Sequence, residues 1–296
     1  MPDPETVCVV VVTHNRVALL RECLTALQGQ TRAPDEILVV DNASSDGTAA
    51  MLATEFPGVD VLRLDTNEGG AGGFHDGMRK AYDNGCDWLW LMDDDTIPAP
   101  SALERLLEGR DTASTLGGAP VALASRVVWD DGRLHPMNTP RTALRRMDEL
   151  VSAASRGLLL IRSASWVSLL VHRHAIESYG LPIKRFFIWT DDVEFTARIL
   201  RREPGYLVPE SVVHHRTRAA YTTADGSPDR FFYYVRNTLY MMRGRAWDTQ
   251  EKMGLLWTLV IQILRFLKRN RSSPGAALAV ARGLAHGVAT PADDSG

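Results

Sequence analysis

Three consecutive carboxylates, Asp93, Asp94 and Asp95, close an apolar run that extends from Trp88 to Met92. A run of this kind is typical of a strand that is buried on both faces. Because unpaired carboxylates are too costly to bury in such a core, we expect them just past the carboxyl end of the strand, where open α/β sheets bind ligands. Neighbouring carboxylates repel one another, and a hard divalent cation such as Mg²⁺ or Mn²⁺ would stabilise them. For the triplet alone, a solvated acidic turn is the alternative.

Two further polar pairs follow apolar segments later in the chain. Asp191 and Asp192 come after an aromatic-rich run, at the expected start of a helix. Acids in a first helical turn often only complement the helix dipole, but a carboxylate in a cleft can act as a general base. His214 and His215 end a strand-like run, and imidazole is a suitable ligand for Mn²⁺ as well as for Zn²⁺. A single histidine in that position is more often structural.

The first hundred residues alternate between strand and helix patterns. Runs of β-branched residues indicate strands, and apolar residues at helical spacing indicate helices. The expected strands are Val7–Val12, Glu36–Val40, Val59–Leu64 and Trp88–Met92, and the expected helices are Val17–Gln28, Thr48–Phe56 and a segment that ends near Asn84. Short connections between such elements predict a parallel, doubly wound sheet. The carboxyl ends of the strands then meet at one edge, where a nucleotide would bind.

Polar residues and glycines follow each of these strands. They are Thr13, Asn15 and Arg16 after the first strand, Asp41 and Asn42 after the second, and Asn67, Gly69 and Gly70 after the third. A G-x-G-x-x-G dinucleotide fingerprint would stand directly after the first strand, where this chain has Thr-His-Asn-Arg instead. The later glycine cluster would let a phosphate approach backbone N–H groups at a helix start, or it would simply form a flexible turn.

Four segments, in order along the chain, resemble family-2 glycosyltransferases with the GT-A fold: VVVVTHNR, EILVVDNASSDGT, LDTNEGGAGGF and WLMDDDT. The GGAGGF segment resembles the galactofuranosyltransferases that build actinobacterial cell-wall galactan, in particular their smaller, initiating member. The resemblance implies transfer of galactofuranose from a UDP-galactofuranose donor to a polyprenyl-diphosphate-linked saccharide. A rhamnosyltransferase that uses dTDP-rhamnose shares nearly all of these motifs. A noncatalytic nucleotide-sugar-binding protein is a third reading, against which the intact acids and histidines argue.

The resemblance also assigns roles to individual residues. It implies a divalent cation, Mn²⁺ or Mg²⁺, bound by Asp93 and Asp95 together with His215, or with His214 as the alternative. Asp192 would be the general base of an inverting transfer, with Asp191 as the second choice. The expected donor contacts are Thr13, Asn15, Arg16, Asp41, Asn42, Asn67, Gly69, Gly70, Asp94 and Arg236, and the expected acceptor contacts are Trp166 and Trp189. For the two tryptophans, a role in the core is an equal alternative.

The composition is that of an ordinary globular protein. The chain has 296 residues, 45% of them hydrophobic, and a net charge of −3, which argues against general nucleic-acid binding. The first residues are acidic where a signal peptide would be basic, and no apolar run reaches the length of a spanning helix. We therefore expect a cytoplasmic protein. Cys8 and Cys86 lie in or beside apolar runs and are expected to be reduced core residues.

The expected domain organisation is a GT-A domain over residues 1–220 and a helical segment over residues 221–296. Within the first domain, residues 1–96 would form the nucleotide-sugar half and residues 97–220 the acceptor half. Two polar stretches are expected to be irregular. They are residues 136–156, a loop near the site or an ordinary surface loop, and residues 291–296, a disordered tail.

The C-terminal segment contains an apolar helix pattern over Met253–Leu267, which is too short to span a bilayer comfortably. Between Arg230 and Arg271 the chain has nine Lys or Arg residues and two acids. An apolar helix bordered by cations fits a helix that lies on the inner surface of the cell membrane. A helix that is packed within the chain or in a homo-oligomer fits the same pattern.

Overall fold

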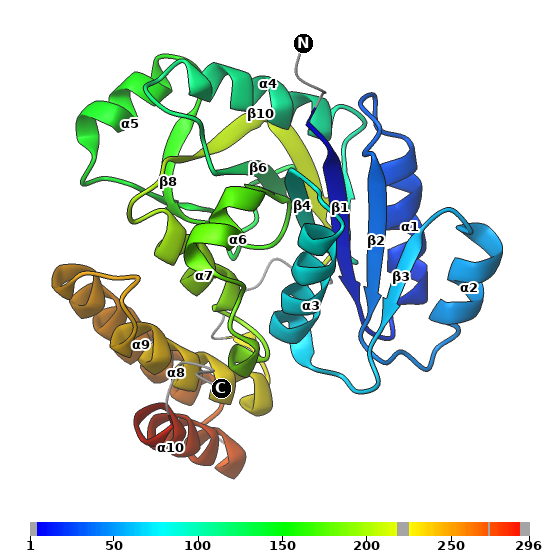
Figure 1. Cartoon of the computed structure of the whole chain (residues 1–296). Coiled ribbons are helices and arrows are strands. Elements are labelled where there is room, and N and C mark those ends of the chain that lie inside the picture. The colour runs from blue at the N-terminus through cyan, green and yellow to red at the C-terminus, as the bar shows by residue number, and fades with distance from the viewer. Residues whose placement is uncertain (1–4, 218–224, 272, 291–296) are drawn as a thin grey trace.

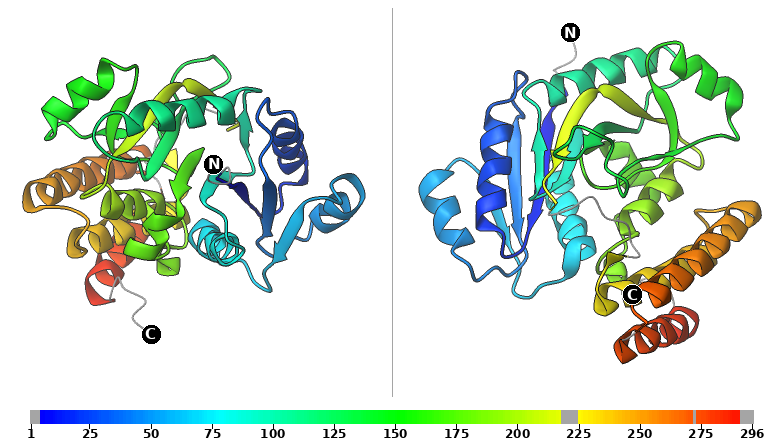
Figure 2. Two further views of the ribbon diagram at one scale, coloured as in Figure 1. Left: turned by 45° about the horizontal axis from the view of Figure 1, so that its top comes forward. Right: turned by 180° about the vertical axis from the view of Figure 1, so that it is seen from behind.

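The structure, a computed structural model, describes residues 5–217, 225–271 and 273–290. A sheet with helices on both faces forms the main body, and three C-terminal helices pack together at one side of it (Figures 1 and 2). The predicted α/β architecture with a C-terminal helical segment is confirmed. The expected disordered tail, residues 291–296, lies outside the described residues.

The bounds of the elements agree closely with the expected ranges in the first hundred residues. The strands are β1 (Val7–Thr13), β2 (Glu36–Asp41), β3 (Asp60–Arg63), β4 (Trp88–Asp93), β5 (Thr96–Pro98), β6 (Ala122–Val128), β7 (Arg141–Thr142), β8 (Leu159–Ser163), β9 (Leu169–His172) and β10 (Gly205–His215). The helices are α1 (Val17–Gln28), α2 (Thr48–Glu55), α3 (Gly69–Asp83), α4 (Ala102–Ser114), α5 (Met147–Ala154), α6 (Arg173–Tyr179), α7 (Asp191–Ile199), α8 (Pro228–Arg243), α9 (Thr249–Arg269) and α10 (Pro274–Ala289), with a 3₁₀ turn at Lys184–Phe186.

The strand order is β3-β2-β1-β4-β9-β6-β10-β8-β7, and β5 pairs with β10. Strands β1 to β4 are parallel, as predicted. The second half of the sheet is mixed, because β9 runs antiparallel to both of its neighbours, β4 and β6. Two features of this topology position the site. The carboxyl ends of β1, β2 and β4 lie side by side, and the end of β10 pairs with β5, the short strand that directly follows the three acids.

Strand β1 shows why the apolar runs are continuous. Its alternate side chains pack in opposite directions, so that Val9 joins Leu20 of α1 in one core and Val10 joins Met78 of α3 in the other. Both faces of the central strands are therefore covered by helices, as a parallel sheet requires.

Two segments are more regular than expected. Residues 136–156 contain β7 and α5, whose first turn carries Asp148 and Glu149. Helix α4 continues to Ser114, past the short helix over residues 101–108 that its sequence pattern predicts. Gly109 is needed for packing, since a Cβ atom there would lie 2.5 Å from a methyl group of Val208.

Helices α8, α9 and α10 share a small core of their own around Phe231, Leu259 and Phe266. A second cluster, which includes Phe186 and Leu255, fixes them to the main body. None of the helices within the described ranges is both long enough and apolar enough to cross a bilayer.

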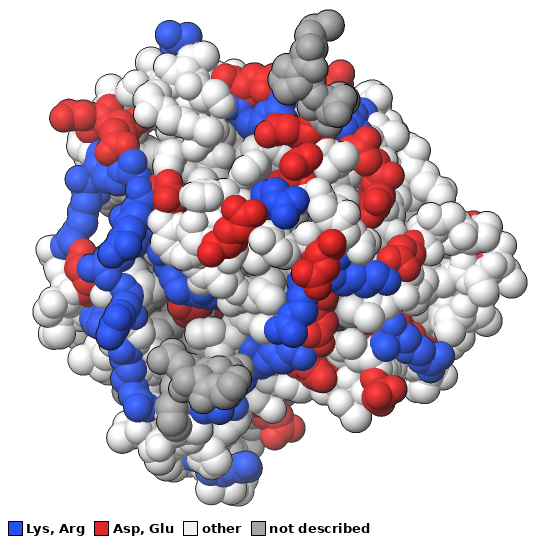
Figure 3. All heavy atoms as spheres, in the orientation of Figure 1, with Lys and Arg blue, Asp and Glu red and all other residues white. Residues whose placement is uncertain are grey.

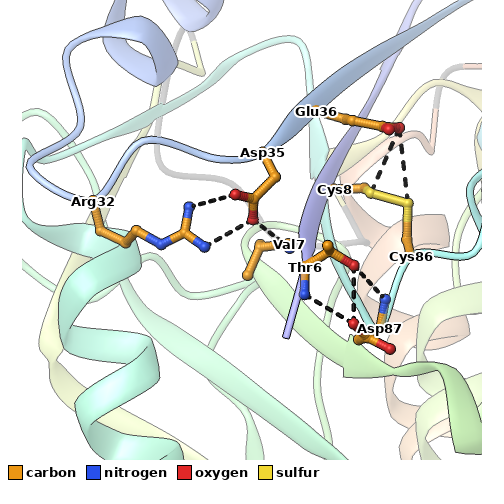
Figure 4. Close-up of a disulfide and its surroundings, with 8 residues drawn as sticks. All are labelled: Thr6, Val7, Cys8, Arg32, Asp35, Glu36, Cys86 and Asp87. Atoms are coloured by element: carbon orange, nitrogen blue, oxygen red, sulfur yellow. Dashed lines mark hydrogen bonds and ion pairs between the residues drawn. A yellow bond between two sulfur atoms is a disulfide. The ribbon is translucent and has the colours of Figure 1, made fainter. Parts of the chain in front are cut away.

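Cys8 and Cys86 form a disulfide, so the prediction that both are reduced was wrong for this structure. Cys8 lies in β1 and Cys86 immediately before β4, and the parallel pairing of the two strands brings their Cα atoms within 6.0 Å. Figure 4 shows Glu36 of β2 beside the pair, with its Oε2 atom 3.7 Å from Sγ of Cys8 and 3.9 Å from Sγ of Cys86. The buried position was expected correctly, but 78 residues of sequence separation conceal the pairing.

Candidate active site

The three acids lie at the end of β4, where the sequence placed them, and two of them contact the last residue of β1 and the loop that follows it. Thr13 Oγ1 donates a hydrogen bond of 2.8 Å to Asp94 Oδ2. Arg16 Nη1 lies 3.1 Å from Asp94 Oδ1 and 2.5 Å from Asp95 Oδ2. The parallel register of β1 and β4 therefore turns two expected donor contacts, Thr13 and Arg16, toward the acids.

His215 completes this group because of strand register. It pairs with Thr96 in the antiparallel β5–β10 ladder, one residue past Asp95, and its Nε2 atom lies 3.2 Å from Asp95 Oδ1. Its Nδ1 atom lies 2.8 Å from Oδ1 of Asn138, an amide oxygen that accepts hydrogen bonds, so this contact orients the ring with Nε2 toward the acids. His214 pairs with Ile97 and, because side chains alternate along a strand, faces the other way.

The acids interact strongly enough to change their proton affinities. Burial, and then repulsion from Asp95 and Asp94, raises the pKa of Asp93 well above its ordinary value. Burial also raises the pKa of Asp94, to about 6, against the attraction of Arg16. Asp95 differs, because His215 and Arg16 outweigh its burial and lower its pKa. Such shifts are typical of groups assembled to bind a cation.

A cavity of about 470 Å³ extends from these acids over the ends of β1 and β2 to the start of α3. The expected donor contacts that line it are Thr13, Arg16, Asn42, Asn67, Gly69, Gly70 and Asp94, and Asp93, Asp95 and His215 line it as well. Four expected residues are not on its wall. Asn15 Oδ1 accepts from Ser45 N, and Asp41 Oδ1 accepts from Ser44 N. His214 and Arg236 are the other two.

The glycine cluster forms the first turns of α3 rather than a loop before it, and its first residue makes the closest contact. Gly69 has φ = +72°, and a Cβ atom there would lie 2.0 Å from the carbonyl oxygen of Phe187. Asn42 fixes this turn, since its Nδ2 donates to Gly69 O at 2.8 Å and its Oδ1 accepts from Glu68 N at 2.8 Å. The N-terminus of α3 therefore faces the cavity, in a position suited to an anion.

Asp191 and Asp192 are the first two residues of α7, and their side chains lie in different surroundings. Asp191 is buried, and its Oδ2 accepts a hydrogen bond of 2.7 Å from Trp166 Nε1. Trp166 is itself stacked on Phe74, with ring centroids 4.8 Å apart, so it serves the core and also borders the donor cavity. Burial first, and then the charge of Asp191, raises the pKa of Asp192, and burial raises that of Asp191.

A second cavity, of about 340 Å³, adjoins the first on the side of the C-terminal helices. Residues on its wall come from the 136–141 segment, from β8, and from α7, α8 and α9. Asp192 and Trp189 line both cavities, and Asn138 does so as well. Asp192 is thus a carboxylate that reaches both spaces, and Asp191 borders only the first.

The segment before α7 has an unusual backbone. Phe187, Trp189 and Thr190 all have positive φ, between 63° and 65°, a conformation that costs about 1–3 kcal/mol at each non-glycine residue. Asn237 of α8 holds this segment, because its buried Nδ2 lies 2.9 Å from Phe186 O, 3.0 Å from Ile188 O and 2.8 Å from Trp189 O. Its amide therefore fixes the backbone that leads to the two acids.

Arg236 has a similar structural role. Its guanidinium lies 2.6 Å from Arg185 O and 2.9 Å from Phe186 O, and it is 4.8 Å from the centre of the Tyr233 ring. These contacts keep it off the wall of either cavity. Arg230, six residues earlier on α8, lines the donor cavity instead.

We expect Asn237→Ala to lower kcat by at least about tenfold and the free energy of unfolding by about 1–3 kcal/mol, because the carbonyls of Phe186, Ile188 and Trp189 all lose the hydrogen bond from its buried amide. The KM for the nucleotide sugar should stay within about twofold, since Asn237 is not on the donor wall. Steady-state kinetics and urea unfolding measure the two effects. The control is Ser211→Ala, which removes a different buried hydrogen-bonding group, a hydroxyl that donates to Ala102 O at 2.8 Å, away from either cavity. Equal kcat losses in both variants would contradict a positioning role.

Sequence reasoning missed several residues of the site. Asn138 and Arg141 lie in the segment expected to be irregular, and their place in the site comes from the strand pairing of β7 with β8 and from tertiary contacts. His135 is a further buried ring, 4.7 Å from the ring of His215, and burial lowers its pKa to about 4. The position of Asn237 in an aromatic, polar helix was the one available signal for its role.

Known proteins resemble this chain along most of its length. The family profile of Glycosyl transferase family 2 matches residues 8–165. Galactofuranosyltransferase GlfT1 of Mycolicibacterium smegmatis is 33% identical over 261 residues, which cover 82% of this chain and 84% of the relative. N-acetylglucosaminyl-diphospho-decaprenol L-rhamnosyltransferase of Mycobacterium tuberculosis is 25% identical over 288 residues, or 85% of this chain and 88% of the relative. The structure of mannosyltransferase PcManGT of Pyrobaculum calidifontis, in complex with GDP-Man and Mn²⁺, covers 96% of this chain and 76% of its own, with a TM-score of 0.57 and 19% identity.

The profile match spans more than half of the chain, and the match to GlfT1 spans most of both proteins. The sheet order and the acids at the end of β4 agree with the fold that these relatives imply. The chain therefore belongs to glycosyltransferase family 2, and it is a glycosyltransferase with the GT-A fold.

Proposed function

We propose that the protein transfers galactofuranose from UDP-galactofuranose to a polyprenyl-diphosphate-linked saccharide in cell-wall galactan synthesis, with inversion at the anomeric carbon. The observation that carries the proposal is the position of Asp192 between two cavities, one lined by the three acids and the other by Arg141 and a mixture of apolar and neutral polar side chains. The 33% identity with a galactofuranosyltransferase over most of both chains supports the donor sugar.

The residues at the end of β4 fit a divalent cation, either Mn²⁺ or Mg²⁺, in the chemistry of their ligand atoms. Asp95 Oδ1 is buried and has no hydrogen-bond partner among the described residues, although the Nε2 atom of His215 faces it at 3.2 Å. A cation between the two would satisfy both atoms, and Asp93 offers a further carboxylate. When bound, such an ion would neutralise charge on the departing diphosphate. The solved mannosyltransferase with GDP-Man and Mn²⁺ supports a metal in this fold.

The chain's own residues would perform the remaining steps. The N-terminus of α3 and Arg230 would hold the donor diphosphate, and Asn42 and Asn67 would position the nucleoside end of the cavity. Asp192 would accept the proton of the acceptor hydroxyl. At the same time the oxygen of that hydroxyl would form a bond to the anomeric carbon, and the bond between this carbon and UDP would break. Trp189 borders both cavities, where its ring would orient the acceptor sugar.

The domain organisation follows from the same assignment. Residues 1–96 would bind the nucleotide sugar, residues 97–220 would supply the base and much of the acceptor wall, and residues 221–296 would close the acceptor cavity from the side of α8 and α9.

Donor turnover tests the proposed function directly. Purified protein is incubated with Mn²⁺ or Mg²⁺, a short polyprenyl-diphosphate-linked saccharide and either UDP-galactofuranose or dTDP-rhamnose, and the release of UDP or dTDP and the mass of the product are followed. We expect turnover of UDP-galactofuranose. The 25% identical rhamnosyltransferase makes dTDP-rhamnose the specific alternative, and turnover of that donor alone would replace the proposal. Donor binding without transfer to any lipid-linked acceptor would favour a noncatalytic protein.

The exposed face of α9 supports association with the inner surface of the cell membrane. Met253, Leu256, Trp257, Val260 and Leu264 share one side of the helix, and Trp257 is 69% exposed. Lys268, Arg269 and Arg271 follow at its end, all exposed. Figure 3 shows a band of Lys and Arg side chains along the left margin of the molecule, between the positions of α5 and α9 in Figure 1. An apolar stripe bordered by cations suits an anionic lipid surface.

We expect the double variant Trp257→Glu/Leu264→Glu to bind anionic phosphatidylglycerol vesicles at least about tenfold more weakly than the wild type, because two large side chains no longer enter the interface. Co-sedimentation with vesicles measures the binding. Val61→Glu on β3 is the matched control, since Val61 is also exposed but lies on the far strand of the sheet. If the stripe is instead a contact between two copies of the chain, the double variant will change the oligomeric state and leave vesicle binding as it was.

A further inference from the structure

Arg141 is a cation on the wall of the second cavity; in the described part of the chain it is attracted by Glu251 but forms no direct ion pair with a carboxylate. Its guanidinium lies 5.4 Å from the centre of the Trp247 ring. Arg162 lies on the same ring at 4.5 Å, but its Nε pairs with Glu251 Oε1 at 2.7 Å and its Nη1 donates to a carbonyl. Of the two arginines on this ring, only Arg141 lines the cavity, and its charge is available to a ligand there.

Two further atoms on the cavity wall point to a polar ligand. Thr190 Oγ1 and Gln262 Oε1 are buried, and neither has a hydrogen-bond partner among the described residues. A buried polar atom without a partner is costly, so native proteins keep few of them except where a ligand or water is bound. They belong to different elements of the wall, since Thr190 lies just before α7 and Gln262 lies in α9.

Helix α9 connects this cavity with the apolar stripe. Leu255, Thr258 and Gln262 line the cavity at a spacing of three and four residues, which places them on one side of the helix. The exposed stripe around Trp257 and Leu264 occupies the opposite side. A helix with its side chains is about 10–12 Å across, so a ligand in the cavity would lie about one helix diameter from the proposed lipid surface.

We propose that the second cavity binds the diphosphate group of a prenyl-diphosphate-linked acceptor, with Arg141 as its principal cationic partner. The inference rests on the proposed function for the identity of the acceptor, and it adds the site and the recognising residue. In this arrangement the saccharide extends from Arg141 past Thr190 toward Asp192, and the prenyl chain leaves along α9 toward the apolar stripe. A guanidinium suits the diphosphate because its planar fork can donate two parallel hydrogen bonds.

Direct binding of farnesyl diphosphate tests the site without any sugar transfer. The titration is made by calorimetry with UDP and Mn²⁺ present at saturation, so that the donor cavity is occupied and cannot bind the probe. We expect Arg141→Gln to weaken binding by at least about tenfold, and Arg141→Lys to weaken it less, because the charge is kept and the fork is lost. UDP affinity should be the same in all three proteins, which also shows that the variants are folded.

A kinetic comparison separates recognition of the diphosphate from a general structural effect. With the diphosphate-linked acceptor, Arg141→Gln should raise KM at least about tenfold and change kcat little. With the same saccharide on a simple alkyl chain, KM should be unchanged. Arg133→Gln is the control for loss of a positive charge, since the Arg133 side chain is 88% exposed.

Either of two results would overturn the inference: farnesyl diphosphate binding that is absent or equal in the wild type and Arg141→Gln, or an equal rise in KM with both acceptors. Failure of sugar transfer in the wild type would count against the proposed function, while the farnesyl diphosphate titration would still decide on the Arg141 site.

Discussion

Replacing Asp192 with asparagine is expected to lower kcat by about a thousandfold, because the acceptor hydroxyl loses the group that removes its proton. The dissociation constant for the nucleotide sugar should stay within about twofold, since Asn is isosteric and the acids at the end of β4 remain in place. Asp192→Ala should lose transfer and keep donor binding in the same way. Release of UDP measures the rate, and calorimetry measures donor binding.

Two matched variants sharpen this result. Asp148→Asn changes an exposed acid in the first turn of α5, a comparable position in a helix outside either cavity, and should keep full activity. Asp191→Asn disturbs the hydrogen bond from Trp166 and should lower kcat by a smaller factor. If Asp191→Asn abolishes transfer while Asp192→Asn keeps more than about a tenth of it, the base is Asp191.

The same substitution has an opposite effect on stability. Burial, and then the charge of Asp191, raises the pKa of Asp192 in the folded protein above the ordinary value of about 4. The stability that this group contributes is therefore complete below the unfolded pKa and is lost as the pH rises through the folded pKa. Asp192→Asn should raise the free energy of unfolding at pH 9 and have little effect at pH 4, as urea unfolding at the two pH values would show. A loss of activity with a gain in stability distinguishes a functional acid from a structural one.

The sequence indicated the first four strands and their helices almost to the residue, because β1 and β4 are continuous apolar runs that end in polar residues. The sequence did not reveal the strand directions in the second half of the sheet. The strands β8 and β9 are short apolar runs, and their direction is decided by neighbours far away in the chain. The disulfide was missed for the same reason, because it is the pairing of β1 with β4 that brings Cys8 close to Cys86.

The candidate site divides in a similar way. Asp93 to Asp95 could be placed from sequence, since a strand end next to a glycine-rich helix start has a known chemical use. The choice of His215 over His214 needed the β5–β10 register, which puts one ring against Asp95 and turns the other away. Arg236 and Asn237 are adjacent in sequence, and the sequence suggested a donor contact for Arg236 and no role for Asn237. Both side chains donate to carbonyls of the segment before α7, whose positive φ angles the sequence does not reveal.

Asp95→Ala is the second change with a large expected effect, and it should differ from the Asp192 variants in kind. Loss of a metal ligand should lower kcat by about a hundredfold or more and also raise the Mn²⁺ concentration needed for half-maximal activity. Donor affinity should fall as well, because the ion would contact the diphosphate. Asp65→Ala, an exposed acid just after β3, is the control and should change none of these quantities.

Combination with His215→Ala decides whether the two side chains act on one ion. If Asp95 and His215 share a ligand, the second substitution should add little to the first, so the double variant should lose far less than the product of the two separate losses. Chelation of divalent ions should reduce the wild type to the level of the double variant, and added Mn²⁺ should restore only the wild type. If the losses of kcat instead multiply and the Mn²⁺ requirement is unchanged, the contact between His215 and Asp95 serves folding. A pair that only orders β5 against β10 has no reason to respond to metal.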